Sequence, residues 1–438
     1  MKNIKSVIIG GLIVLGLQLQ SCTKNGGDEG GVDPTGSVTV TGEYSVFAWN
    51  DLGMHCLNPT YDKAVILPPY NNLMVQVIKR GSPPQVVTAG ITVSYKLINN
   101  TASYSKRSYG GFWDNAQKLF GTTLAHDTGL KGNGLTGNMK ANDNFFIAGG
   151  IPVVPVDDNN TWSPFQVAEV TVKNGSGTTL ATTRATVPTS DEINCAKCHG
   201  TATTAFDDVL SKHDAAEGTS LSNNKPVLCA GCHPSPALGI TTGPQMFLSK
   251  AIHGFHASKG ASCYDCHPGT ITKCNRSLAH NNNEAADGNC IQCHGDLATV
   301  AGSIAGGRVP WVSEPACTKC HSTDISGINT GTALYRNSKG HGNIYCSACH
   351  GSPHAMYPSR ETSDNYQASQ YQNPDKIKTI GSCGYCHNDS RGEGATDDFA
   401  EVHGGTNPER SIGCRACHTS ISPATASWPH AYTWTNTN

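Results

Sequence analysis

Cys195-Ala-Lys-Cys-His199 is the first copy of a pattern, Cys-x-x-Cys-His, that occurs eight times in this 438-residue chain. The copies begin at Cys195, Cys229, Cys263, Cys290, Cys317, Cys346, Cys383 and Cys414. The shortest step between neighbouring copies is 27 residues, from 263 to 290, and the longest is 37, from 346 to 383. Such a regular series fills the second half of the chain and has to be explained as one feature.

The pattern is typical of c-type haem attachment, in which two thiols form thioethers with the porphyrin and the adjacent histidine binds the iron. Zinc sites instead close with four ligands from paired half-motifs, and a disulfide framework leaves the eight histidines unexplained. We therefore predict eight haem c groups. The thioether cysteines are Cys195, Cys198, Cys229, Cys232, Cys263, Cys266, Cys290, Cys293, Cys317, Cys320, Cys346, Cys349, Cys383, Cys386, Cys414 and Cys417. The proximal iron ligands are His199, His233, His267, His294, His321, His350, His387 and His418.

Ten histidines lie outside the motifs, and we call them spare histidines. Two of them, His55 and His126, precede the first motif. The other eight equal the haems in number, which predicts bis-histidine coordination with an undetermined pairing, since only Met246 and Met356 offer a thioether after Cys195. The predicted distal ligands are His213, His253, His256, His280, His341, His354, His403 and His430.

Two local spacings refine this prediction. His253-Gly-Phe-His256 resembles the His-x-x-His of small tetrahaem cytochromes, which implies that the two histidines serve different haems. His350 and His354 are four residues apart, which predicts that a proximal and a distal ligand share one short helical face.

Residues 189–438 contain few aliphatic side chains. Leu, Ile, Val and Phe account for 31 of these 250 residues, which is below the roughly 20% at which chains tend to fail to build a core. We therefore predict that the apolar porphyrins form the core of an octahaem cytochrome domain of low secondary-structure content, with short helices carrying the motifs.

The first 21 residues have the features of an export signal. Lys2 and Lys5 precede an apolar segment, residues 7–19, that is too short to span a membrane. Leu19-Gln-Ser-Cys22 resembles the lipobox of bacterial lipoproteins, which implies lipidation of Cys22; an ordinary secretory signal is the alternative. Residues 22–37 are rich in Gly and are expected to form a flexible tether. Their acidic stretch resembles the surface-export signal of Bacteroidota lipoproteins, which implies an outer-membrane lipoprotein on the cell surface, and a periplasm-facing anchor is the alternative.

Residues 38–188 predict a β-rich, sandwich-like domain. Alternating segments separated by Gly, Pro and Asn are typical of short antiparallel strands. Asn174-Gly175 is a hairpin-turn signal. The expected strands lie at residues 37–41, 86–88, 91–95, 167–172 and 178–187.

Within this region Ala48-Trp-Asn-Asp-Leu-Gly-Met-His-Cys56 resembles a module at the front of several exported multihaem cytochromes. Met54, His55 and Cys56 are all ligands suited to copper, but three consecutive residues favour a structural turn instead. Cys56 and Cys274 remain outside the motifs, and we hypothesise a disulfide between them; two independent thiols are the alternative.

The whole chain resembles the multihaem outer-membrane lipoprotein cytochromes of anaerobic, metal-respiring bacteria. That resemblance implies an electron carrier and not an enzyme, one that passes electrons between an outer-membrane or periplasmic donor and an extracellular acceptor. The implied partners are other multihaem cytochromes or a porin-cytochrome conduit. The net charge of −2 and the lack of a basic patch give no sign of nucleic-acid binding.

Two alternatives remain open. One is an octahaem reductase or oxidase of a small nitrogen or sulfur compound with one open haem, although no Cys-x-x-Cys-Lys occurs in the chain. The other is a subunit of an extracellular haem filament.

Overall fold

The computed structural model describes residues 42–81, 83–269, 271–278, 280, 288–316, 334–369 and 385–386. The predicted export signal, the tether and the strand expected at 37–41 lie outside these residues. The same holds for ten of the predicted haem ligands and attachment residues: Cys317, Cys320, His321, Cys383, His387, His403, Cys414, Cys417, His418 and His430.

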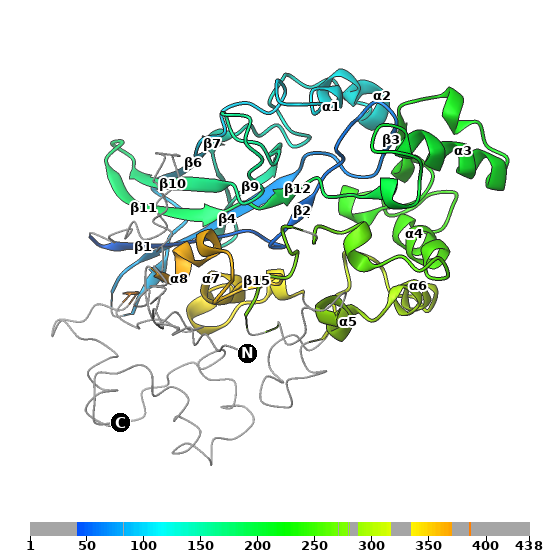
Figure 1. Ribbon diagram of the computed structural model, residues 1–438. Coiled ribbons are helices and arrows are strands. Elements are labelled where there is room, and N and C mark those ends of the chain that lie inside the picture. The colour runs from blue at the N-terminus through cyan, green and yellow to red at the C-terminus, as the bar shows by residue number, and fades with distance from the viewer. Residues whose placement is uncertain are drawn as a thin grey trace, which may run out of the picture. The chain divides into compact units, whose positions relative to one another are not determined.

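Two antiparallel sheets make up the N-terminal region (Figure 1). The first sheet has the order β1 (Tyr44–Trp49), β4 (Asn71–Lys79), β9 (Phe145–Ile151) and β8 (Lys140–Asn142), with β5 (Gln85–Val86) also paired to β4. The second has the order β11 (Thr179–Thr186), β10 (Val167–Asn174), β6 (Ile91–Leu97) and β7 (Thr136–Asn138). The predicted β-rich N-terminal region is therefore confirmed.

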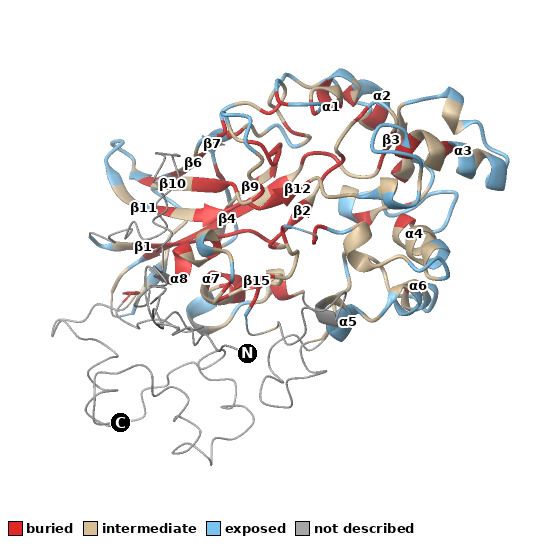
Figure 2. Cartoon of the chain, in the orientation of Figure 1, coloured by how far each residue is buried: buried red, intermediate tan, exposed pale blue. Residues whose placement is uncertain are grey.

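One hydrophobic core lies between the two sheets. It includes Val46 and Val75 from the first sheet and Val93 and Val170 from the second, all of them buried. Successive side chains of a strand point to opposite faces, so these alternating positions turn the valines inward. The strands accordingly contain many of the buried residues in Figure 2. The sheets thus pack face to face, as in a sandwich.

The outer face of the first sheet is also apolar. Phe47 and Trp49 of β1 and Met74 of β4 point away from the sandwich core and join a second buried cluster. Ile78 of β4 also belongs to it, and the rest of this cluster comes from much later in the sequence: Tyr345, Ala348, Tyr357, Ala368 and Tyr385. Helices α7 (Cys346–His350) and α8 (Tyr366–Ser369) therefore lie against this sheet (Figure 1).

Two glutamine side chains fix this contact. Gln76 of β4 accepts a hydrogen bond from the Tyr345 amide at 3.0 Å. Gln367 of α8 accepts one from the Ala48 amide at 2.9 Å and donates to Thr183 at 2.8 Å. Part of the motif-bearing segment is thus bonded to the sandwich, while the domain boundary at residues 188 and 189 stays a prediction.

The strands expected from alternation are found where the pattern is clean. Those at 91–95, 167–172 and 178–187 correspond to β6, β10 and β11, and the segment at 86–88 overlaps β5. The predicted turn at Asn174 joins β10 to β11, and its side-chain oxygen accepts from the amides of Ser176 and Thr178. The hairpin prediction is therefore confirmed.

Short helices and 3₁₀ turns are spread through the remaining described chain. The α-helices are α1 (Gly111–Asp114), α2 (Ala116–Phe120), α3 (Ala205–Glu217), α4 (Leu248–His256), α5 (Gly288–His294) and α6 (Leu297–Ala305). The 3₁₀ turns are η1 (Cys195–Lys197), η2 (Leu221–Asn223), η3 (Cys229–Gly231), η4 (Pro236–Leu238), η5 (Cys263–Asp265), η8 (Tyr335–Asn337), η9 (His341–Asn343) and η10 (Thr362–Asn365). Helices α3 to α6 expose much of their surface (Figure 2), as expected where little protein core is available.

Three pairs of two-residue strands are present in the described chain, and the first two tie early parts of the chain to later ones. They are β2 (His55–Cys56) with β12 (Thr189–Ser190), β3 (Ala64–Val65) with β13 (Val227–Leu228), and β14 (Gly351–Ser352) with β15 (Ala355–Met356). Within the residues that the structure describes, no helix has both the length and the apolar character needed to cross a membrane.

Candidate haem-binding sites

The first three motifs each fold as a single tight turn, and the fourth and sixth lie in the short helices α5 and α7. In the first motif the His199 amide donates to the Cys195 carbonyl at 2.9 Å, and in the third the His267 amide donates to the Cys263 carbonyl at 2.8 Å. Residues three and four apart lie on the same side of such a turn. The turn therefore places the two thiols and the histidine of a motif close together, as attachment to one porphyrin requires.

Four pairs of imidazole rings face one another, and each pair joins a motif histidine to a spare histidine. The ring centres are 6.4 Å apart for His199 and His256, 6.4 Å for His233 and His213, 6.0 Å for His267 and His253, and 6.2 Å for His294 and His354.

The separation of these rings fits an iron between them. A metal–imidazole bond is about 2 Å long, and with the ring centre about 1.1 Å behind the nitrogen two axial imidazoles lie about 6.2 Å apart. Rings stacked in direct contact are much closer, as Tyr104 and His126 are at 3.5 Å, and edge-to-face contacts in this protein reach 5.9 Å, between Tyr104 and Trp113. The residues present therefore fit a haem iron at each of the four pairs.

In six of the eight paired histidines the second ring nitrogen is held by an oxygen. The Nδ1 atoms of His253 and His256 lie 2.6 Å and 2.8 Å from the carbonyl oxygens of Ser249 and Ile252, one turn earlier in α4. The other Nδ1 contacts are His233 to the Met246 carbonyl (3.0 Å), His354 to the Leu52 carbonyl (3.0 Å), His199 to the Asp208 carboxylate (2.9 Å) and His213 to the Thr219 hydroxyl (3.0 Å). A carbonyl or ionised carboxylate oxygen only accepts, and the Thr219 hydroxyl already donates to Asp214 at 2.6 Å. Nδ1 therefore carries the proton at these rings, and the Nε2 lone pair is left for a metal.

Burial keeps some of these rings neutral. It lowers the pKa of His267 and of His354 to about 4. A neutral imidazole offers its lone pair to iron without first losing a proton. Burial also raises the pKa of the Cys195 and Cys229 thiols to about 11.

Helix α4 carries both histidines of the His253-Gly-Phe-His256 segment. The His253 ring faces His267, and the His256 ring faces His199, so the two histidines serve different motifs in the arrangement found. Gly254 lies between them, and a Cβ atom added there would come within 3.6 Å of Ala301 in α6. A small residue at this position lets α4 and α6 pack closely.

The predicted sharing of a helical face by His350 and His354 is wrong. Helix α7 ends at His350 because Gly351 has a φ of +82°, and the chain then enters β14. His354 lies in the turn between β14 and β15 and faces His294 of a different motif. The remaining described spare histidines of this half lie elsewhere: His341 begins η9, and the His280 carbonyl accepts from the Asn275 amide.

Cys56 and Cys274 are close enough to interact but are not bonded in the structure. Burial raises the pKa of both thiols, that of Cys274 to about 12. The disulfide between them stays a prediction.

Neighbouring His55 is buried and its Nε2 lies 2.8 Å from Asp51, while Met54 is buried in the protein interior. Over the described ranges no group of three His, Cys, Asp or Glu side chains is arranged to hold a free metal ion.

Several oxygen atoms that hold the histidines carried no sequence signal. The Asp208 carboxylate lies nine residues after His199, and the Leu52 carbonyl lies about three hundred residues before His354. A backbone carbonyl is common to all residue types, so sequence alone could not have identified Leu52. Asp208 becomes a candidate only once α3 is known to lie beside the first motif.

A family model described as cytochrome c554 and c-prime matches residues 306–351. The matched segment spans the fifth motif and the sixth. No curated protein matches the chain, and no solved structure does. The match indicates a c-type cytochrome that binds haem c and has a haem-based role in electron transfer.

Proposed function

We propose that this chain is an electron carrier that holds eight haem c groups, each with its iron between two imidazoles. The observation that carries the proposal is the set of four ring pairs at 6.0 to 6.4 Å, each joining a motif histidine to a spare one. When bound, a haem with both axial positions filled exchanges single electrons and leaves no open position for a substrate.

The surrounding residues determine how strongly each imidazole donates to the iron. A hydrogen bond from Nδ1–H to an oxygen makes Nε2 more basic, which stabilises the oxidised iron and lowers the reduction potential. The effect should be larger where the acceptor is charged, as it is at His199 and Asp208. Different oxygen partners thus give the sites different potentials.

Helix α4 keeps two sites close together. His253 and His256 are neighbours on one helix face, so the two porphyrins that they bind share one rigid support. Rigid neighbouring sites suit transfer of electrons along a series of haems.

The cellular setting that we propose follows from the sequence. Lipidation at Cys22 would anchor the chain in the outer membrane, with the cell surface as the site of action. The partners would be other multihaem cytochromes or a porin-cytochrome conduit on one side and an extracellular acceptor on the other. This arrangement corresponds to anaerobic respiration by extracellular electron transfer.

The coordination state of the purified full-length protein tests the proposal. We expect eight haems per chain by mass, and wholly low-spin electron paramagnetic resonance (EPR) signals in the oxidised protein. A high-spin haem that shifts on addition of nitrite, hydroxylamine or sulfite would contradict the carrier and support the octahaem reductase or oxidase. Replacing Cys22 with Ser should release the protein from the membrane fraction, and retention of that variant would contradict the lipid anchor.

A further inference from the structure

We infer that residues 50–54, the loop between β1 and β2, position His354 and thereby tune the haem attached at Cys290 and Cys293. We call this segment the 50–54 loop. The inference rests on the proposed bis-histidine coordination, and it gives the β-rich region a role in the electron-transfer half of the chain. The loop belongs to the Ala48–Cys56 module, whose role the sequence left open.

The Leu52 carbonyl holds both the ring and the backbone of His354. It lies 3.0 Å from the ring Nδ1 and accepts from the His354 amide at 3.3 Å. Beside it, the Ser352 hydroxyl donates to the Asn50 carbonyl at 2.6 Å. The turn that carries His354 is therefore hydrogen-bonded to the loop through both Ser352 and His354, and the centre of the His354 ring lies 6.2 Å from that of His294.

The close approach of the loop to this turn requires glycine at position 53. Gly53 has a φ of +91°, a backbone conformation that favours glycine. A Cβ atom there would lie 3.1 Å from the Ala355 amide nitrogen and 3.3 Å from the His354 carbonyl carbon. These are backbone atoms of the turn that carries the ligand, so a side chain at position 53 would push loop and turn apart.

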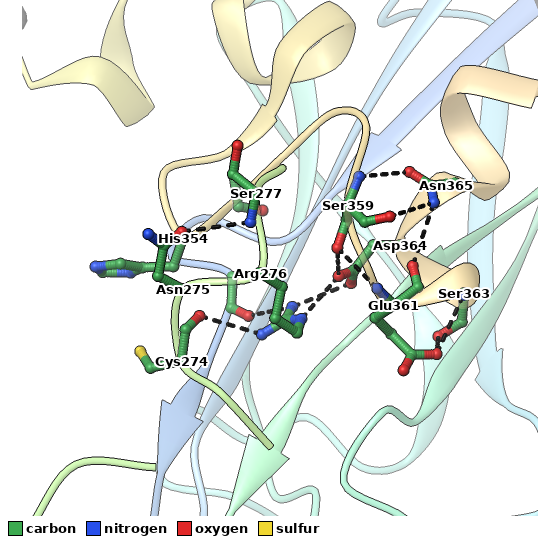
Figure 3. Close-up of polar contacts among 12 residues, drawn as sticks. Cys274, Asn275, Arg276, Ser277, His354, Ser359, Glu361, Ser363, Asp364 and Asn365 are labelled. Carbon is green, nitrogen blue, oxygen red and sulfur yellow. Dashed lines mark hydrogen bonds and ion pairs between the residues drawn. The ribbon is translucent and has the colours of Figure 1, made fainter. Parts of the chain in front are cut away.

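Arg276 also links the 50–54 loop to the turn that carries His354 (Figure 3). Its guanidinium donates to the Gly53 carbonyl at 2.7 Å and to both oxygens of Asp364, at 2.8 and 3.1 Å. Its own backbone amide donates to the His354 carbonyl at 2.8 Å. Arg276 and Asp364 are almost fully buried, with side chains 2% and 3% exposed. A buried ion pair is tolerated only when its donors and acceptors are satisfied, which here requires the loop in place.

The loop is also rigid in itself. The Asn50 side-chain oxygen accepts from the amides of Leu52 and Gly53, at 3.0 and 2.7 Å. The Asp51 carboxylate lies 2.8 Å from Nε2 of His55 and accepts a hydrogen bond from the side-chain amide of Asn72 at 2.7 Å. These bonds fix the direction of the Leu52 carbonyl independently of its contact with His354. A fixed carbonyl at Nδ1 raises the basicity of the ring and lowers the potential of the iron it binds.

Two substitutions test the inference in the full-length holoprotein. We expect Gly53→Ala to raise the reduction potential of one haem among the eight and to change one low-spin EPR signal. Gly90→Ala is the matched control, because Gly90 also has a positive φ, +74°, but a Cβ atom there would meet nothing within 4 Å. We expect this control to leave all potentials at their wild-type values.

Arg276→Gln is the second test, in case Gly53→Ala does not fold. It breaks the link between Gly53 and Asp364, and we expect the low-spin EPR signal of the same haem to change. Arg184→Gln is its control, because the Arg184 side chain pairs with Glu169 on the second sheet and lies 3.8 Å from it. If Gly53→Ala and Arg276→Gln affected different haems, a shared action through His354 would be contradicted.

His354→Ala separates failure of the inference from failure of the proposed function. It should turn one low-spin haem into a high-spin one, and an unchanged spectrum would show that His354 is not a ligand. If His354→Ala changes one haem but neither Gly53→Ala nor Arg276→Gln changes the potential or the EPR signal of that haem, the positioning role of the loop is overturned while the bis-histidine coordination stands.

Discussion

His253 and His256 lie three residues apart on α4, yet their rings face the histidines of two different motifs. His253 faces the third motif through His267, and His256 faces the first motif through His199. One helical turn thus bridges two attachment sites that are far apart in the sequence. Damage to either histidine should therefore affect one haem and leave the other intact.

We expect His253→Ala and His256→Ala each to convert one low-spin haem into a high-spin one, because each removes a different axial ligand. The double variant should convert two. EPR spectroscopy of the oxidised proteins measures the count. His126→Ala is the control, since His126 is exposed and stacks on Tyr104. Loss of only one low-spin haem in the double variant would mean that both rings serve the same iron.

Asp208→Asn should raise the potential of the haem attached at Cys195 and Cys198. The carboxylate accepts from Nδ1 of His199, and a neutral amide would make that imidazole less basic. We expect a shift on the order of tens of millivolts, where about 59 mV is a tenfold change in a one-electron equilibrium constant. Potentiometric titration followed by visible spectroscopy gives the value.

Asp207→Asn is the matched control for that experiment. Asp207 is the preceding residue of α3, but it pairs with Lys63 and Lys225 and not with a histidine. An equal shift in both variants would show a general effect of charge and would argue against the hydrogen bond to His199.

Gln367→Leu should destabilise the contact between the sandwich and the later chain. The substitution leaves the Ala48 amide and the Thr183 hydroxyl without their Gln367 partner in a buried setting. A buried group left unsatisfied costs about 1–3 kcal/mol, so the Ala48 amide alone gives an expected loss of about 1–3 kcal/mol. Denaturant unfolding followed by tryptophan fluorescence measures it. Gln85→Leu, at an exposed position of β5, should change stability by less than about 0.5 kcal/mol.

Asp51→Asn should destabilise the protein at neutral pH and less so in acid. Burial alone would raise the pKa of Asp51, but His55 and the Asn72 amide outweigh it and hold the pKa below 3.8. A carboxylate with a lowered pKa stabilises the fold above its unfolded pKa, and this contribution is lost as the pH falls through the folded pKa.

The wild type should therefore exceed the variant by about 1.5–3 kcal/mol at pH 7, the range for a hydrogen bond to a charged group. The difference should shrink below pH 4. Denaturant midpoints of both proteins at pH 7, 5 and 3.5 give the comparison. A difference that grows toward acid would mean that Asp51 is protonated in the folded protein.

The strands that were predictable from sequence bury only one face. In β6 and β10 buried and less buried residues alternate, and the hairpin signal at Asn174 fixes their neighbour β11. Strand β1 gave no such signal, because Val46 packs into the sandwich while Phe47 packs against the later chain. A strand buried on both faces shows no alternation.

The candidate sites were predictable as a set of residues but not as pairs. Local spacing identifies Cys195, Cys198 and His199 because they belong to one turn. The pairing of His294 with His354 depends on where β14 and β15 meet the 50–54 loop, which is a long-range contact. The four-residue spacing of His350 and His354 predicted a shared helical face, which is wrong because Gly351 ends α7 before His354.

The buried position of Cys346 sets an order of events during maturation. This cysteine begins α7, which lies against β1, and only 7% of its surface is exposed. An enzyme that joins a porphyrin to a thiol has to reach the sulfur, so the attachment proposed at this motif would precede docking of the helix on the sheet. Strand β1 is made long before α7, and N-terminal parts of a chain generally fold first. In that order of events, the apolar outer face of the sheet stays exposed to solvent until the proposed haem has been added to α7.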